Sequence, residues 1–193
     1  MSQPSTPLRV LAFAGSLRQA SYNRALLLAA VELQPPSLSI EIFDLDGLPV
    51  FNEDLEAKGD PEKVVAWKAA IASSDALLIA CPEYNFGISS PLKNAIDWAS
   101  RPPGKSVLGG KPTAIVGASS TAGATRLAQL MTRQVLSALA IPVLPAPMFM
   151  LGLAGEKFVD GRLTDERSRE LLRRVLVGLE GWAARFAPAA ASA

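Results

Sequence analysis

Short apolar runs alternate along the chain with segments in which apolar residues recur at helical spacing. The apolar runs are bounded by prolines or turn residues, as strands are, and they lie at residues 8–14, 38–43, 76–80, 111–118 and 141–144. Helical periodicity is clearest at residues 26–33, 61–71, 127–139 and 164–186. Strands that alternate with helices predict an α/β domain with a parallel sheet covered by helices on both faces.

The second apolar run indicates the order of the strands. Residues 38–43 alternate apolar with polar side chains, and the other runs do not. Alternation is typical of a half-exposed strand, which places this strand at an edge of the sheet. An edge position favours a doubly wound five-stranded sheet of order 2-1-3-4-5 over the dinucleotide-type order 3-2-1-4-5-6. The loops after strands one and three then flank the crevice where such sheets bind ligands.

Length and charge restrict the class of protein. The chain of 193 residues, 49% hydrophobic, predicts one domain over residues 1–193, with loose ends at 1–7 and 188–193. A net charge of +1 disfavours nucleic acid or an anionic membrane as a partner. No apolar segment is long enough to span a membrane, and residues 1–7 do not resemble a signal peptide.

The absence of histidine excludes several kinds of chemistry. Without histidine the chain has no Ser-His-Asp triad, no histidine general base and no histidine-ligated metal site. The single cysteine, Cys81, cannot hold an iron–sulfur cluster, and we expect it to be a small buried hydrophobe. A lone cysteine without a disulfide partner favours a cytoplasmic location. If the protein is an enzyme, we expect an organic cofactor to supply the chemistry.

The loop after the first predicted strand is suited to a phosphate. Ser16, Arg18, Ser21 and Asn23 precede or open a helix, and a helix N-terminus attracts anions. One glycine does not make Gly-x-Gly-x-x-Gly, so a phosphate monoester fits better than a dinucleotide. The alternative is a plain helix cap, with Ser21 closing the helix and Arg18 in solvent.

The loop after the third strand, residues 82–86, is aromatic and polar. Pro82 ends the strand because it has no N–H for the sheet. Tyr84, Asn85 and the backbone amides suit a planar heteroaromatic ring. Alternatively, Tyr84 belongs to the core, and Glu83 is a surface carboxylate or the partner of a helix. The next helix is expected to begin at Ser89 or Ser90, with Pro91 in its first turn.

The loop after the fourth strand is small and rich in hydroxyl groups. Ser119 and Ser120 lie within residues 117–123 and could approach the same ring. The alternative is an ordinary turn in which Ser or Thr caps the following helix.

Three blocks of residues resemble the NAD(P)H-dependent FMN reductase family, especially the branch often called chromate or quinone reductases. The resemblance covers roughly the whole domain and implies a flavodoxin-like fold with FMN held non-covalently. The blocks are Gly15-Ser16-Leu17-Arg18 with Ser21 and Asn23, then Pro82-Glu83-Tyr84-Asn85, then Leu92-Lys93-Asn94-Ala95-Ile96-Asp97-Trp98 with Ser100-Arg101-Pro102.

The resemblance also implies roles for individual residues. The FMN phosphate is expected at Ser16, Arg18, Ser21 and Asn23. The isoalloxazine ring is expected at Pro82, Glu83, Tyr84 and Asn85, with Ser119 and Ser120 closing the site.

The implied function is an enzyme in which FMN takes a hydride from NADH or NADPH and passes reducing equivalents onward. A shared ring face predicts ping-pong kinetics, with quinones, free flavin, azo compounds or metal oxyanions such as chromate as acceptors. Arg101 is a candidate anion contact near the ring, or alternatively a structural salt bridge or a subunit contact. Homodimers or homotetramers are expected, with Trp98 and Arg101 as interface candidates, and the alternative for Trp98 is a core position.

Two other classes are disfavoured by the sequence. A flavodoxin-like electron carrier without NAD(P)H turnover is expected to be strongly acidic, which this chain is not. A dinucleotide-binding enzyme would use Asp44 or Asp46 on a ribose, but the glycines it needs are missing. Those aspartates are expected instead to serve the turn at Asp46-Gly47.

Overall fold

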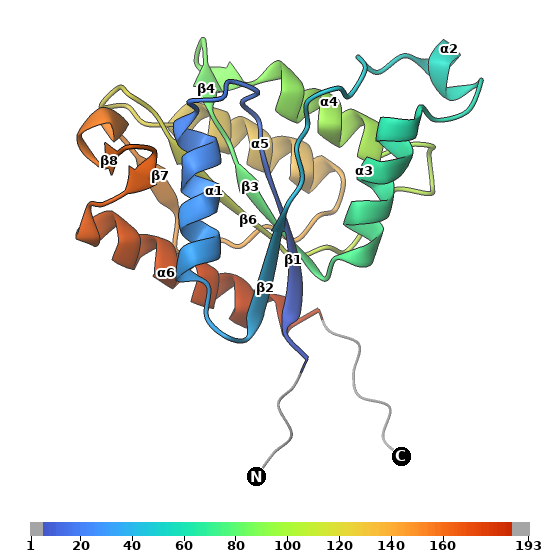
Figure 1. Cartoon of the computed structure of the whole chain (residues 1–193). Helices are drawn as coiled ribbons and strands as arrows, with labels where there is room; N and C mark the ends of the chain where they lie inside the picture. The colour runs from blue at the N-terminus through green and yellow to red at the C-terminus, as the bar shows by residue number, and fades with distance from the viewer. Residues whose placement is uncertain (1–5, 187–193) are drawn as a thin grey trace, which may run out of the picture.

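The fold is organised around a five-stranded parallel sheet in the order β2-β1-β3-β6-β7 (Figure 1). The structure is a computed structural model that describes residues 6–186. Of the ends expected to be loose, residues 1–5 and 188–193 lie outside the described residues. The strands are β1 (Leu8–Ala14), β2 (Leu38–Ile42), β3 (Ala76–Ala80), β6 (Thr113–Ala118) and β7 (Phe149–Leu151). The predicted order of strands is confirmed.

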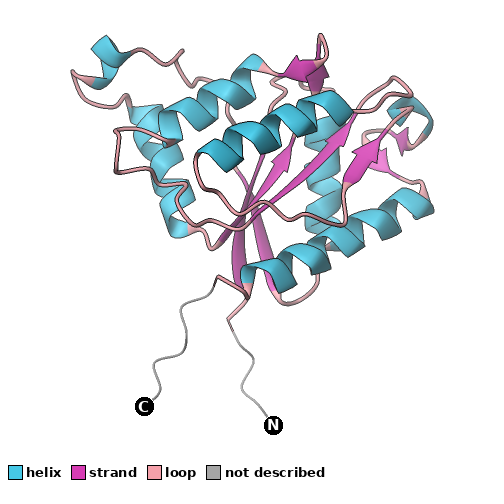
Figure 2. Cartoon of the chain, turned by 180° about the vertical axis from the view of Figure 1, so that it is seen from behind, coloured by secondary structure: helices cyan, strands magenta, loops and turns pink. Residues whose placement is uncertain are grey.

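Helices cover both faces of the sheet, as Figures 1 and 2 show from opposite sides. One face carries α1 (Tyr22–Leu33) and α6 (Glu166–Ala183). The other carries α3 (Glu62–Ser73), α4 (Ser90–Ala99) and α5 (Arg126–Ala138). A single-turn helix, α2 (Glu53–Glu56), lies in the long connection between β2 and α3. Within residues 6–186, no helix is both long enough and apolar enough to cross a membrane.

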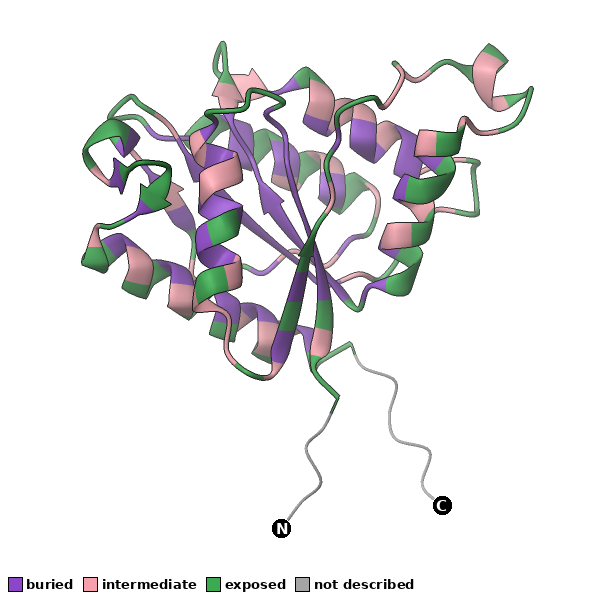
Figure 3. Ribbon diagram, viewed as in Figure 1, coloured by how far each residue is buried: buried purple, intermediate pink, exposed green. Residues whose placement is uncertain are grey.

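Side chains of β1 alternate between two hydrophobic cores, because successive residues of a strand point to opposite faces. Val10, Ala12 and Ala14 pack in the core beneath α1 and α6. Leu11 and Phe13 pack in the core beneath α3, α4 and α5. Figure 3 shows the inner strands buried.

The second strand lies at the edge of the sheet, as its alternation predicts. Leu38 and Ile40 are buried, whereas Ser39 and Glu41 are exposed. Its only partner among the described strands is β1.

The fifth strand is not where the apolar run at 141–144 places it. Val143 makes only an isolated bridge to Thr113, and the strand that pairs with the end of β6 is Phe149–Leu151. Prolines at 142, 145 and 147 explain the error, since none of them has an N–H to give to a ladder. The chain therefore stops pairing with β6 after Leu144 and pairs with it again at β7.

Two small hairpins interrupt the loops. One consists of β4 (Glu83–Tyr84) and β5 (Gly87–Ile88), and the other of β8 (Phe158–Val159) and β9 (Arg162–Leu163), which follows a 3₁₀ turn at Ala154–Glu156. The first was missed because its turn, Asn85-Phe86, lacks glycine. Both turn residues have positive φ, at 49° and 64°, as a type I′ hairpin turn requires.

Candidate functional site

Three loops meet at the carboxyl edge of the sheet, at the switch point between β1 and β3. They are residues 15–21 after β1, residues 81–89 after β3 and residues 119–125 after β6. Figure 1 shows the start of α1 and the β4 hairpin side by side at this edge. All the candidate site residues except Asn23 and Arg101 lie in these loops, and the fold brings the loops together.

The first loop combines a capped helix with free donors. Ser21 is the N-cap of α1, and its Oγ accepts from the N–H groups of Asn23 at 3.2 Å and Arg24 at 3.5 Å. The cap alternative is therefore confirmed for Ser21. Among the described residues, none accepts a hydrogen bond from the N–H groups of residues 17–20, and Arg18 is exposed without an ion pair. Free amides, a helix N-terminus and an unpaired guanidinium form an anion-binding arrangement.

The only glycine of this loop, Gly15, is required by the close approach of α4. An added Cβ would lie 2.5 Å from Ser89 Oγ and 2.8 Å from Leu92 Cβ. Ser89 donates its hydroxyl to the Gly15 carbonyl at 2.7 Å. Ser89 is the N-cap residue of α4, but this bond replaces the side-chain cap that the sequence predicted. The first and second loops are thereby joined.

The side chain of Asn23 bonds a neighbouring strand, and its expected role on a phosphate stays a prediction. Its side chain is buried against Ala118 at the end of β6. Asn23 Nδ2 donates to the Ala118 carbonyl at 2.9 Å, and the Ala118 N–H donates to Asn23 Oδ1 at 3.0 Å. Both ends of the amide are occupied, so Asn23 joins the first loop to the third.

The second loop contacts the first through Tyr84. The Tyr84 hydroxyl donates to Ser16 Oγ at 3.0 Å, while half of Tyr84 remains exposed. Ser16 is buried, and its own hydroxyl hydrogen has no acceptor among the described residues. Pro82 is buried at the base of the hairpin, and Asn85 is exposed at its tip. Tyr84 is therefore not a core residue, and its hydroxyl links the second loop to the first.

Glu83 is the partner of a helix through its carboxylate, which is the alternative that the sequence left open, and its contact with a ring stays a prediction. Its Oε2 accepts from the N–H groups of Leu127 at 2.8 Å and Ala128 at 3.0 Å in the first turn of α5. The carboxylate satisfies amides that would otherwise lack partners and offsets the positive end of the helix dipole. The α5 N-cap residue, Thr125, makes no side-chain cap bond. Glu83 therefore fixes the β4 hairpin on α5.

The third loop presents its hydroxyl groups at the same edge. The Ser119 N–H donates to the Leu151 carbonyl at 2.9 Å, and Ser119 Oγ accepts from the Thr121 N–H at 3.2 Å. Ser119 is half-buried, whereas Ser120 is exposed.

Arg101 is held by acids of the α2 turn, so its structural salt-bridge alternative is confirmed. Its guanidinium lies 2.8 Å from Glu56 Oε2 and 3.2 Å from Glu53 Oε1. The hydrogen bond to Glu56 raises the pKa of Arg101 further above its usual range. The anion contact expected of Arg101 stays a prediction beside this ion pair.

Cys81 is inert in this structure. The residue is fully buried, and its Sγ lies 3.3 Å from Thr132 Oγ1. Burial raises the pKa of the thiol to about 11. The expectation of a small buried hydrophobe is confirmed.

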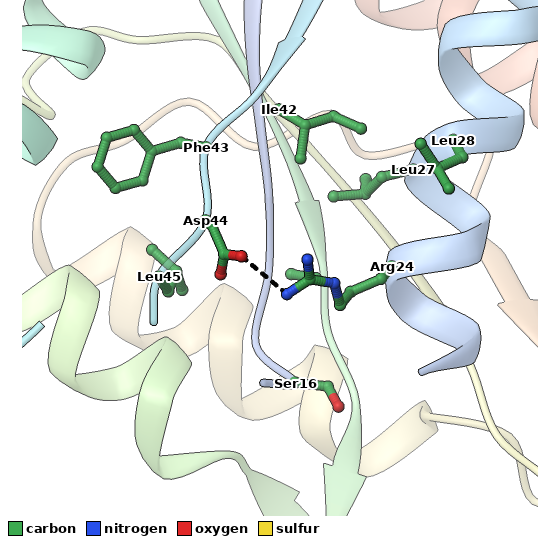
Figure 4. Close-up of a pocket in the computed structure, with 9 residues that line it drawn as sticks. Ser16, Arg24, Leu27, Leu28, Ile42, Phe43, Asp44 and Leu45 are labelled. Atoms are coloured by element: carbon green, nitrogen blue, oxygen red, sulfur yellow. Dashed lines mark hydrogen bonds and ion pairs between the residues drawn. The ribbon is translucent and has the colours of Figure 1, made fainter. Parts of the chain in front are cut away.

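A cavity of about 190 Å³ adjoins the first loop on the side of β2 (Figure 4). Arg24 and Asp44 face each other across it, with Arg24 Nη1 3.0 Å from Asp44 Oδ2, and Ser16 lies at one end. Asp44 Oδ1 also accepts from the Asp46 N–H at 3.0 Å, which is the turn role expected of this aspartate. That hydrogen bond is the main reason that the pKa of Asp44 is lowered. Sequence reasoning missed Arg24, although it lies in the first turn of α1.

Comparison with known proteins places this site in a family. The family model for NADPH-dependent FMN reductase matches residues 8–156. The chain is 45% identical to an NAD(P)H-dependent FMN reductase of Pseudomonas aeruginosa, over 94% of this chain and 98% of that protein. It is 41% identical to an NADPH:quinone oxidoreductase of Arabidopsis thaliana, over 93% of each. A solved structure of FerB, a flavoenzyme NAD(P)H:(acceptor) oxidoreductase from Paracoccus denitrificans, matches with a TM-score of 0.86 at 32% identity, over 93% of this chain and 98% of that chain.

The fold and the site thus define a flavodoxin-like oxidoreductase. The chain belongs to the NADPH-dependent FMN reductase family, with FMN as cofactor and NAD(P)H as donor. The residues present fit this cofactor, because the free amides of residues 17–20 and the unpaired Arg18 suit a phosphate monoester. The half-exposed Tyr84 beside them suits a flat ring.

Proposed function

We propose that the protein is an FMN-dependent NAD(P)H:quinone reductase that holds its flavin non-covalently across the first and second loops. The observation that carries the proposal is the Ser16–Tyr84 hydrogen bond, 3.0 Å long. It joins an anion-binding helix N-terminus to an aromatic, amide-bearing hairpin within one crevice. A flavin mononucleotide requires these two chemistries side by side.

The proposed cofactor contacts use the groups that the fold leaves free. Ser16, Arg18 and the amides of residues 17–20 hold the phosphate, and Ser21 orients them by capping α1. The backbone of Pro82–Asn85, together with Tyr84, supports the ring. Ser119 and Ser120 close the site from β6. Asn23 and Glu83 act indirectly, by fixing the loops on which these groups lie.

FMN supplies hydride acceptance from a nicotinamide and electron donation to an acceptor. The protein contributes position, because no histidine is available as an acid or base. Donor and acceptor are proposed to occupy the same face of the ring in turn, which gives ping-pong kinetics. Quinones are the favoured acceptors because similar proteins carry quinone reductase in their names. Free flavin, azo compounds and chromate are proposed as further acceptors.

A homodimer or homotetramer in the cytoplasm is proposed as the working form. Support for self-association comes from exposed apolar side chains on the β4 hairpin and the neighbouring face of α5, which are Phe86, Leu127, Leu130 and Met131. Support for the location is the single, buried, unpaired cysteine.

The test is a steady-state assay of NADPH and NADH oxidation in which donor and quinone concentrations are both varied. The proposal predicts turnover, and parallel double-reciprocal lines indicate the ping-pong order. A flavodoxin-like carrier would bind FMN but oxidise neither nicotinamide. Absence of turnover in an FMN-loaded preparation would support the carrier.

A further inference from the structure

A second, larger cavity lies between α4 and the segment that precedes α3. We refer to residues 49–56, which include α2, as the strap. The cavity has a volume of about 450 Å³ and is closed on one side by the strap and on another by the first turn of α4. Its apolar lining consists of Leu17, Leu45, Leu48, Val50, Phe51 and Pro91. Because Leu17 belongs to the first loop, the cavity borders the proposed flavin site.

Two side chains of α4 bind the backbone of the strap. Asn94 Oδ1 accepts from the Phe51 N–H at 2.8 Å, and Asn94 Nδ2 donates to the Pro49 carbonyl at 2.9 Å. One helical turn later, Trp98 Nε1 donates to the same Pro49 carbonyl at 2.8 Å. These hydrogen bonds hold the backbone at Pro49 and Phe51, on either side of Val50. They therefore fix the apolar wall that Val50 and Phe51 form.

Arg101 holds the other end of the strap. It donates two hydrogen bonds to Glu56 Oε2, at 3.1 and 2.8 Å, and its guanidinium lies 5.6 Å from the centre of the Phe51 ring. Phe51 in turn packs edge-on against Trp98, with ring centres 5.0 Å apart. The Glu56 side chain is only 15% exposed, so its carboxylate depends on this cation.

The charges at the rim of the cavity argue against the nicotinamide cofactor as its occupant. A dinucleotide carries phosphates, and free cations bind these strongly. Among residues 6–186, the one cation that lines the cavity is Lys93, and its Nζ is bound to both oxygens of Asp97, at 2.7 and 2.9 Å. An uncharged, flat, apolar ligand fits such a lining.

We propose that this cavity binds the apolar ring of a quinone acceptor, and that Asn94, Trp98 and Arg101 are positioning residues that set its width through the strap. The inference rests on the proposed function, since a quinone is useful there only beside the flavin. It assigns Arg101 a role in acceptor selection without contact with the acceptor. Quinones with a second fused ring depend on the cavity more than single-ring quinones, because they bury more apolar surface.

The test uses the FMN-loaded protein and two probes, 2-methyl-1,4-naphthoquinone and 1,4-benzoquinone. The dissociation constant of each probe is measured by equilibrium dialysis without NAD(P)H, and KM is measured separately by turnover. Arg101→Met loosens the strap, and Val50→Trp narrows the cavity from a position that is 83% exposed and so tolerates substitution. Arg101→Lys is the conservative variant. Arg9→Met removes a comparable pair with Asp75, distant from the cavity, and is the matched control.

The proposal predicts that Arg101→Met and Val50→Trp weaken naphthoquinone binding and raise its KM roughly tenfold, while benzoquinone changes little. Arg101→Lys recovers part of the loss, and Arg9→Met has no effect on either probe. The rate at which NADPH bleaches the flavin stays unchanged in the control variant Arg9→Met. Equal effects on both quinones, or none, would overturn the inference. So would a shift in sedimentation from oligomer to monomer without a change in naphthoquinone binding, since a second copy of the chain would then cover the cavity.

The proposed function and this inference fail differently. If NADPH does not bleach the flavin of the unsubstituted protein, the proposed function is wrong. If NADPH bleaches the flavin normally, but the dissociation constant and KM for the naphthoquinone are the same in all variants, only the cavity assignment is wrong.

Discussion

Asn23 and Ala118 lie 95 residues apart and exchange two hydrogen bonds, with Asn23 Nδ2 2.9 Å from the Ala118 carbonyl and the Ala118 N–H 3.0 Å from Asn23 Oδ1. The pair fixes the first turn of α1 against the end of β6. It therefore sets the distance between the loop proposed to bind the phosphate and the loop proposed to close the site. We expect a buried amide used in this way to be a structural part of the site.

Replacing Asn23 tests this role. Asn23→Ala leaves a buried N–H and a buried carbonyl of Ala118 without partners, and each costs about 1–3 kcal/mol. We expect the free energy of unfolding in urea to fall by about 2–4 kcal/mol and FMN affinity to fall with it. Asn23→Asp keeps the acceptor and loses the donor, so its free energy of unfolding should lie between those of Asn23→Ala and the unsubstituted protein. Ser120→Ala, at an exposed serine, is the control and should leave stability unchanged. An Asn23→Ala protein with full stability but weak FMN binding would instead indicate a direct cofactor contact.

Glu83 should respond as a helix cap. Its carboxylate accepts two N–H groups of α5, so Glu83→Ala should lower the free energy of unfolding by about 1–2 kcal/mol. Glu83→Gln keeps an acceptor oxygen and should retain most of the stability. Thermal denaturation of the apo-protein measures both. If the two variants were equally stable while the visible spectrum of the bound flavin changed, Glu83 would be a ring contact.

Arg18 should discriminate FMN from riboflavin, which lacks the phosphate. A hydrogen bond to a charged group contributes about 1.5–3 kcal/mol, so Arg18→Ala should weaken FMN binding by roughly 10- to 150-fold. Riboflavin binding should change little. Quenching of flavin fluorescence measures both affinities, with Arg167→Ala on the exposed surface of α6 as the control. Equal losses for the two flavins would place Arg18 away from the phosphate.

Cys81 should impose an alkaline limit on stability. Burial raises the pKa of the folded thiol from 9.0 to about 11, so the unfolded thiol loses its proton first as the pH rises. The contribution is complete below pH 9 and is lost as the pH rises through about 11. Over that range it amounts to at most about 3 kcal/mol.

Comparing Cys81→Ala with the unsubstituted protein isolates this effect, because tyrosine and lysine titrate alike in both. The unfolding free energy of the unsubstituted protein, minus that of Cys81→Ala, should fall as the pH rises from 9.0 to about 11. Iodoacetamide should not modify Cys81 in the folded protein at pH 8. Rapid modification under native conditions would contradict the burial of this thiol.

The periodicity of the sequence was sufficient to predict the sheet and most of its helices, because continuous apolar runs and one alternating run determine which strands are inner and which is the edge. The exposed Ser39 and Glu41 beside the buried Leu38 and Ile40 show why that inference succeeded. It failed at the fifth strand, where prolines override an apolar run. It also missed the type I′ turn at Asn85-Phe86, because Phe replaces the glycine that usually marks such a turn.

The candidate site was predicted as a set of loops more accurately than as a set of contacts. Sequence places Asn23, Glu83 and Arg101 near the ligand but cannot show which group each side chain bonds. Their partners are Ala118, the first turn of α5, and Glu56, all at least 44 residues away. Such pairings depend on distances in the folded protein, which residue type and spacing do not reveal. From the sequence alone, a polar side chain that bonds another part of the protein looks the same as one that bonds a ligand.

The most direct test of the central claim is an anaerobic titration of the purified, FMN-loaded protein with NADPH and then NADH, followed in the visible spectrum. The account predicts that at least one nicotinamide bleaches the flavin absorbance, and that one equivalent of a quinone then restores it. A flavin that is bound but keeps its absorbance with both nicotinamides would contradict the account.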